Sequence, residues 1–162
     1  IVLCLVGSEM CIRDRLIDKV YKGGGSGLAS TIEDYFKFSQ MLLNGGELNG
    51  KRILSRKTVE LMTMNHLPDN KTLLDMNAGG GFSEVRYQGM GYGLSMAVTV
   101  DQAATQISGT AGSYNWGGMA STFFWIDPKD NLLGIFMTQL RPSTTFPFRG
   151  QMQAMVHGAF ED

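Results

Sequence analysis

Two adjacent glycines that follow a tryptophan, Trp116-Gly117-Gly118, are the residues in this sequence best suited to shape a binding site. Glycine has no side chain, so a Gly-Gly pair at the start of a strand lets a ligand or another segment approach the backbone closely. One interpretation is a bare backbone edge that forms a wall of a substrate groove beside the Trp116 indole. The other is a β-bulge without a binding role, and these residues by themselves favour the bulge.

The histidines and glycine-rich segments do not match other common sites. His66 and His157 are far apart in the sequence and lack the i, i+4 spacing of a helical zinc pair. The sequence has no G-x-S-x-G nucleophile elbow, which argues against a Ser-His-Asp triad in this chain. The glycine run at residues 23–27 is not followed by Gly-Lys-Ser/Thr, so it is not a phosphate loop. We expect no metal and no cofactor.

Composition excludes two classes of partner. The chain has 162 residues, of which 43% are hydrophobic and 18% charged, and its formal net charge is -1. Such a composition is typical of one globular domain or of a piece of one. Without a basic cluster there is no electrostatic reason to expect nucleic acid as a partner. No apolar run approaches the roughly 20 residues of a membrane span.

The first fifteen residues differ from the remainder. They contain both cysteines, Cys4 and Cys11, and the segment Leu5–Arg15 resembles one translated frame of a transposase adapter used in sequencing-library preparation. We therefore interpret residues 1–15 as a non-native segment. A secretory signal is the alternative, but the apolar run Ile1–Val6 is short and lacks both preceding basic residues and a cleavage site. The compartment and the oligomeric state cannot be inferred.

A helix from about residue 31 to residue 43 is the first predicted element after a possible short strand at 16–21. Ser30 and Glu33 have the spacing of a capping box at its start. Glu33 and Lys37 are expected on its solvent side. Its buried side is predicted to contain Ile32, Tyr35, Phe36, Ser39, Leu42 and Leu43.

Further elements follow from turn signals and periodicity. Asn49-Gly50 predicts a tight hairpin turn, Ser55 begins a helix that ends near Met64, and residues 66–89 read as a long surface loop. The strands of an antiparallel meander are expected at 92–100, at 119–126 and at 132–138. A final helix starting near Pro147 should cover one face of the sheet with the stripe Phe148, Met152, Met155, Val156 and Ala159.

The order of several segments resembles the serine β-lactamase-related family. The segments are GGGSGLASTIEDYFKFSQMLLNGGELNGKRILSRKTVELM, then GMGYGL, then GSYNWGGMASTFFWIDP and a terminal helix, covering nearly all of residues 23–160. The branch that they resemble most is the family VIII carboxylesterases, relatives of class C β-lactamases and penicillin-binding proteins. The resemblance implies an α+β fold with an antiparallel sheet covered by helices, in which residues 16–162 form the carboxyl-terminal part of one β-lactamase/transpeptidase-like domain.

The family's nucleophile motifs are absent from this chain. In that family a serine of an S-x-x-K motif attacks the substrate, activated by the lysine and by the tyrosine of a Y-x-N-type motif. Here Ser55, Ser83 and Ser113 are followed at the third position by Thr, Arg and Trp, and no Y-x-N occurs. A serine hydroxyl without an adjacent base is a poor nucleophile. We therefore expect the nucleophile and base upstream of Leu16, and the chain alone to be inactive.

The third motif of the family, K-T-G, corresponds by this resemblance to Trp116-Gly117-Gly118. The resemblance then implies that Trp116, Gly117 and Gly118 contact substrate and that the backbone N–H of Met119 is one of two oxyanion-hole donors. Such a donor must be rigid and aimed at the developing negative charge. Trp116 replaces a lysine that would bind the carboxylate of a β-lactam, and its apolar ring favours a neutral ester. The remaining interpretation of Trp116 is simple packing.

Three functions follow as hypotheses. The first is a serine hydrolase fragment whose parent cleaves small-molecule acyl esters through an acyl-serine. The second is a β-lactamase or peptidase acting on β-lactams or peptides. The third is a non-catalytic, β-lactamase-like binding protein. Because partner elements would be missing, we also expect residues 16–162 to be poorly soluble when expressed alone.

Overall fold

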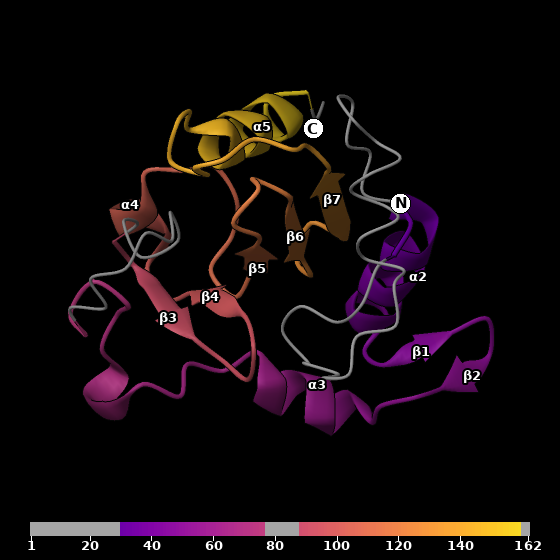
Figure 1. The fold of residues 1–162 in the computed structure, drawn as a ribbon. Helices are drawn as coiled ribbons and strands as arrows, with labels where there is room; N and C mark the ends of the chain where they lie inside the picture. Colours follow the sequence, from indigo (N-terminus) through magenta and orange to yellow (C-terminus); the bar gives the residue numbers. More distant parts are fainter. Residues whose placement is uncertain (1–29, 77–87, 160–162) are drawn as a thin grey trace, which may run out of the picture.

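The computed structural model describes residues 30–76 and 88–159 (Figure 1). The possible strand at 16–21, the glycine run at 23–27 and the segment 1–15, which we interpret as non-native, lie outside these ranges. The elements are α2 (Ile32–Leu43), β1 (Glu47–Leu48), β2 (Lys51–Arg52), α3 (Arg56–Met62), a 3₁₀ helix (Pro68–Asn70), β3 (Met90–Tyr92), β4 (Ala97–Thr99), α4 (Gln102–Thr105), β5 (Tyr114–Gly117), β6 (Phe123–Asp127), β7 (Leu132–Phe136) and α5 (Phe148–His157).

Five strands form one antiparallel sheet in chain order, β3-β4-β5-β6-β7. The predicted α+β class and the antiparallel meander are therefore confirmed. β6 lies between β5 and β7, and all five of its residues are buried. Because successive side chains on a strand point to opposite faces, Phe123 and Phe124 mark the two sides of the sheet.

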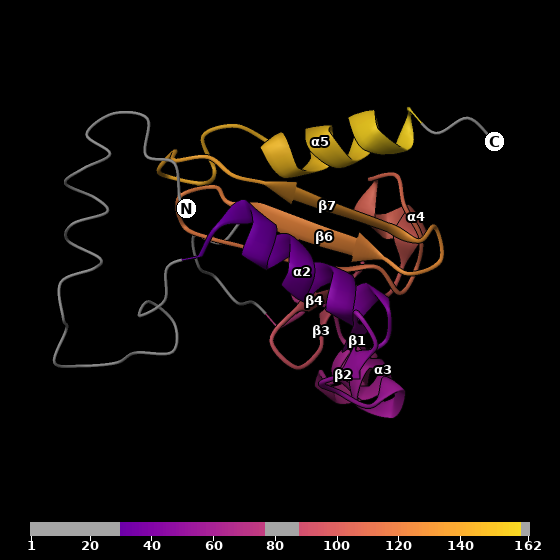
Figure 2. The same cartoon turned by 90° about the vertical axis from the view of Figure 1, so that its right-hand side faces the viewer.

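Helices α2 and α5 cover these two sides. The ring of Tyr35 on α2 meets that of Phe124, with centroids 5.2 Å apart, and the guanidinium of Arg149 on α5 lies 5.5 Å from the ring of Phe123. Figures 1 and 2 show the same arrangement, with α5 and α2 on opposite sides of β6 and β7. The larger apolar cluster lies on the α2 side and contains Met41, Leu42, Val59, Met96, Val98, Tyr114, Phe124 and Ile126.

The start of α2 corrects the predicted capping box. Thr31, rather than Ser30, is the N-cap, and its hydroxyl accepts a bond from the Asp34 N–H at 3.1 Å. Lys37 pairs with Asp34 at 3.2 Å instead of with Glu33. Both hydroxyl residues have an acid three positions later, so the spacing could not distinguish between them.

The helix faces also differ in part from the predicted stripes. On α2, Ser39 and Leu42 are buried as predicted, but Ile32 and Phe36 are about half exposed, at 50% and 48%. The same holds for α5, where Phe148, Met152 and Val156 are partly buried while Met155 is 71% exposed and Ala159 is exposed. The predicted coverage of one sheet face by this last helix is confirmed by the contact of Phe148 with Phe136, whose ring centroids are 5.7 Å apart.

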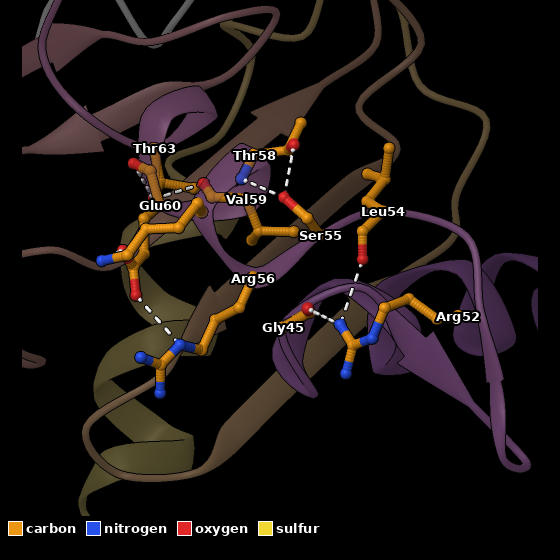
Figure 3. A network of polar contacts seen from close by, with 10 residues as sticks. Gly45, Arg52, Leu54, Ser55, Arg56, Thr58, Val59, Glu60 and Thr63 are labelled. Carbon is orange, nitrogen blue, oxygen red and sulfur yellow. Dashed lines mark hydrogen bonds and ion pairs between the residues drawn. The ribbon is translucent and has the colours of Figure 1, made fainter.

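The predicted hairpin and second helix are present. Asn49 and Gly50 have φ values of 51° and 72° between β1 and β2, as a type I′ turn requires. The Ser55 hydroxyl caps α3 by accepting the Thr58 N–H at 3.0 Å. In Figure 3 the Arg52 guanidinium donates to the carbonyls of Gly45 and Leu54, which fixes the hairpin against the segment leading into α3.

The predicted single strand at 92–100 is wrong, because the chain turns back between β3 and β4. The Gly93 N–H donates to the Met96 carbonyl at 2.8 Å, and Ser95 has a φ of 78°. The Leu94 N–H donates to the carbonyl of Met62 at the end of α3. Apolar residues continue to alternate with small ones through this turn, so the sequence pattern did not reveal the turn. Within the described residues, no helix is long and apolar enough to cross a membrane.

Candidate functional site

The Trp116-Gly117-Gly118 motif lies where β5 ends and the chain turns into β6. Trp116 pairs with Phe124 and Gly117 with Phe123 in the antiparallel register. The Gly118 N–H then donates to the Thr122 carbonyl at 2.7 Å, which closes the turn. Neither glycine forms a bulge within the ladder, because the pairing stays one to one up to Gly117.

This turn corrects the predicted strand at 119–126. The strand begins only at Phe123, so Met119 and Ser121, which were expected to alternate within it, lie in the turn. The Ser121 N–H donates to the Gly118 carbonyl at 3.0 Å, and Ser121 has a φ of 70°. The Met119 amide is thus presented by a tight turn at the end of the strand pair.

The segment that follows β7 fixes the far side of the turn. The Ser121 hydroxyl donates to the Leu140 carbonyl at 2.7 Å, and the Leu140 N–H donates to the Ala120 carbonyl at 3.0 Å. Thr122 adds a longer hydroxyl bond, at 3.4 Å, to the Thr138 carbonyl. These contacts restrain the turn from outside its own sequence, which gives it a defined backbone geometry.

Exposure rises steadily along the motif toward the turn. Tyr114 is only 1% exposed, Trp116, Gly117 and Gly118 are partly buried, and Met119 is 58% exposed. Within the described residues, no backbone acceptor engages the Met119 N–H. The turn therefore presents the Met119 N–H without a backbone acceptor among residues 30–76 and 88–159, and the same holds for the N–H of Ala120.

Trp116 has a clear packing role. Its indole meets the Tyr92 ring edge-on, with centroids 5.3 Å apart and planes at 71°. It also packs against both apolar clusters, the large one under α2 and a smaller one formed by Leu73, Met90 and Ala97. The side chain nevertheless stays partly exposed, so packing and substrate contact are compatible at this position.

Neither Tyr114 nor the two histidines place a general base at the turn. Tyr114 is two residues before Trp116, but burial raises the pKa of its phenol, so the phenolate is not accessible near neutral pH. His157 lies 3.7 Å from Asp130, at the opposite end of β6 from the turn, and His66 bonds to the Leu61 carbonyl. Across residues 30–76 and 88–159, no group of three potential metal ligands is found.

Two serines considered in the sequence analysis, Ser55 and Ser113, and Ser121 of the turn are engaged in structural hydrogen bonds. Ser55 caps α3, and the Ser113 hydroxyl bonds to that of Thr99 at 2.9 Å in the buried interior. Ser121 donates to a backbone carbonyl. Ser83 lies outside the described residues. None of these three described hydroxyls bonds to a basic side chain, and S-x-x-K is absent from the whole sequence.

One residue at the turn was missed by sequence reasoning. Arg149 on α5 is only 6% exposed and donates from Nη2 to the Gly118 carbonyl at 3.1 Å. A signal was available, because a cation in the first turn of a helix opposes the helix dipole and therefore calls for a compensating partner. The partner could not be identified without the fold.

Comparison with known sequences gives one family. The beta-lactamase family model matches residues 8–157. Protein Rv1367c of Mycobacterium tuberculosis strain ATCC 25618 / H37Rv and protein MT1414 of strain CDC 1551 / Oshkosh are each 33% identical over 121 residues. The match covers 73% of this chain but only 29% of each relative's length.

Solved structures show the same fold. EstCE1, described as a hydrolase with promiscuous acyltransferase activity, is similar with a TM-score of 0.70 and 22% identity, over 90% of this chain and 35% of its own. A mutant of simvastatin synthase (LovD) from Aspergillus terreus has a TM-score of 0.63 and 25% identity, over 83% of this chain and 35% of its own. In each case the chain spans about a third of the neighbour.

Proposed function

The chain belongs to the beta-lactamase family, and from this premise we propose that it is the carboxyl-terminal part of a serine hydrolase that cleaves small acyl esters. The reaction would pass through an acyl-serine intermediate. The intact protein would supply the attacking serine and its base, and this chain one wall of the site. In this proposal residues 16–162 are native and residues 1–15 are not.

The observation that carries the proposal is the uncommitted N–H of Met119. Attack on an ester carbonyl places a negative charge on its oxygen, and fixed N–H donors stabilise that charge without reorganising during the reaction. The Met119 amide fits these requirements, because its residue is exposed, it lies in a restrained turn and its N–H donates to no backbone acceptor within the described residues. A second donor would come from the nucleophile's own backbone.

The substrate class follows from Trp116. A neutral acyl chain can pack on the exposed part of its ring, whereas a substrate carboxylate gains no cation there. Gly117 and Gly118 keep the adjacent backbone open to the acyl group. EstCE1 is described as a hydrolase with promiscuous acyltransferase activity, which is consistent with an acyl-enzyme in this fold.

The test begins with recovery of the gene upstream of Leu16 and expression of the intact protein. A fluorophosphonate probe should then label one serine within an S-x-x-K motif, as located by peptide mass mapping. The labelled protein should lose the ability to hydrolyse a short nitrophenyl ester.

The controls separate the alternatives. Replacing the labelled serine by alanine should abolish both labelling and ester hydrolysis. Absence of S-x-x-K from the intact gene would contradict the proposal and favour a binding protein. Hydrolysis of a chromogenic cephalosporin at a rate matching that of the ester would instead favour a β-lactamase.

A further inference from the structure

Arg149 connects the last helix to the turn that carries Met119. It is the second residue of α5 and is buried, with its guanidinium over the ring of Phe123 at 5.5 Å from the centroid. Its Nη2 donates to the Gly118 carbonyl at 3.1 Å. The same carbonyl accepts the Ser121 N–H at 3.0 Å. Two donors therefore fix the direction of a single carbonyl.

We propose that Arg149 is a positioning residue that aims the Met119 N–H at the substrate oxygen. The carbonyl of Gly118 and the N–H of Met119 belong to one peptide unit, which is planar and trans. In such a unit the two groups point in opposite directions. A donor that holds the carbonyl on one side therefore sets the direction of the N–H on the other. This inference rests on the oxyanion role proposed above for Met119.

The charge on Arg149 strengthens the effect. Burial lowers the pKa of Arg149 to about 10, which still leaves the guanidinium charged near neutral pH. A hydrogen bond from a charged donor is shorter and stronger than one between neutral groups. Bonds in a chain also polarise one another, so the cation at the Gly118 carbonyl makes the Met119 N–H a better donor.

An arginine suits this place better than a lysine. Its guanidinium lies over the Phe123 ring and at the same time donates to the Gly118 carbonyl. A lysine ammonium could reach the carbonyl but would lack the broad planar cation over the ring. Position 149 thus requires both the contact with the Phe123 ring and the hydrogen bond to the Gly118 carbonyl. The conservative change Arg149→Lys should therefore retain only part of the function.

The test uses the intact protein with Arg149→Met, which keeps side-chain bulk without donors, and Arg149→Lys. For a short nitrophenyl ester, Arg149→Met should lower kcat roughly tenfold to a hundredfold, the scale expected for a misplaced catalytic group. KM should change less than about twofold, because binding of the ground state does not use the oxyanion donor. Arg149→Lys should recover part of kcat. The matched control Arg56→Met removes an exposed arginine on α3 and should leave kcat unchanged.

A second readout reports on position without requiring activity. The order parameter of the Met119 amide, measured by nuclear magnetic resonance relaxation, should be about 0.85 in the wild type and fall toward 0.6 in the Arg149 variants. An unchanged order parameter and an unchanged kcat in a folded Arg149→Met protein would overturn the inference. If Arg149→Met does not fold, the same two measurements on Arg149→Lys decide the question.

Failure of the proposed function has a different signature. If Met119→Pro, which removes the N–H itself, leaves ester hydrolysis unchanged, then the oxyanion role is wrong. The order parameter would still show whether Arg149 holds this peptide. The two claims can therefore be rejected separately.

Discussion

The indole of Trp116 meets the ring of Tyr92 edge-on, with the ring centroids 5.3 Å apart. The contact links β5 to β3 across the intervening strand β4. It fixes Trp116 in place, and the residue stays partly exposed. The residue that distinguishes this motif from a lysine-containing one is therefore also part of the core.

Trp116→Ala should both destabilise the intact protein and weaken ester binding. Loss of the edge-on contact and of the packing on two apolar clusters should lower the free energy of unfolding by about 3 kcal/mol. Urea denaturation measures this change. Trp116→Phe is the matched variant, because it keeps an aromatic ring beside Tyr92.

The KM of the same variants tests the substrate role. If the exposed part of the Trp116 ring binds the acyl chain, Trp116→Ala should raise KM for a short ester several-fold under conditions where it stays folded. An unchanged KM in folded Trp116→Ala would show that Trp116 serves packing alone.

Gly134→Ala should disrupt the face of the sheet under α5. Gly134 on β7 pairs with Trp125, and a methyl group at Gly134 would lie 2.1 Å from the Trp125 ring. Because the ring occupies that space, the substitution should cost about 3 kcal/mol by overpacking. Gly158→Ala, at the helical end of α5, should change stability by less than about 1 kcal/mol. Equal midpoints in urea for both variants would refute this packing.

Asp127 should be the most costly carboxylate to remove. It is fully buried and accepts the N–H of Thr110 at 2.8 Å, the hydroxyl of the same residue and the N–H of Lys129 at 3.1 Å. Asp127→Ala leaves these donors unsatisfied, which should cost roughly 2 to 4 kcal/mol. Asp130→Ala, at an exposed position nearby, should cost less than about 0.5 kcal/mol. A comparable loss in both would contradict this assignment.

Asp34, at the start of α2, should make the stability of the folded protein depend on pH. Hydrogen bonds from Lys37 and then Thr31 lower the pKa of Asp34. A carboxyl with a lowered pKa in the folded state stabilises the protein above its unfolded pKa, near 4, and loses this effect as pH falls through the folded value. The melting temperature of Asp34→Asn should thus lie below that of the wild type at pH 7 and approach it at pH 3.

Glu33→Gln provides the control for α2. Glu33 was the acid expected from the sequence to cap this helix, and the contacts place Asp34 in that role. The melting temperature of Glu33→Gln should therefore stay close to that of the wild type at both pH 7 and pH 3. If Glu33→Gln behaves as predicted for Asp34→Asn, the capping box expected from the sequence is the correct one.

Local patterns predicted most elements of the fold, and they failed at the turns. Asn49-Gly50 identified its hairpin because these residues tolerate a positive φ. The turns at Ser95 and Ser121 place serine at a positive φ, which is uncommon, and apolar alternation runs through both. Two predicted strands therefore had wrong boundaries.

The candidate site was predictable only as far as the motif itself. Family resemblance proposed residues 116–119 as site residues, but periodicity placed Met119 inside a strand, whereas it lies in the turn before β6. Arg149 could not be assigned to Gly118, because a hydrogen bond between a helix and a turn distant in the sequence depends on how the helix packs on the sheet. Such tertiary contacts leave no local pattern.

The most direct measurement of the central claim compares kcat of Met119→Pro and Met119→Leu in the intact protein. Proline removes the N–H proposed as oxyanion donor, which bonds to no backbone acceptor within the described residues, and also fixes φ of residue 119 and restricts Gly118, whereas leucine keeps the N–H and the backbone freedom. Met119→Pro should lower kcat for a short ester by about a hundredfold to a thousandfold, while Met119→Leu stays near the wild type. A folded Met119→Pro protein with wild-type kcat would contradict the account.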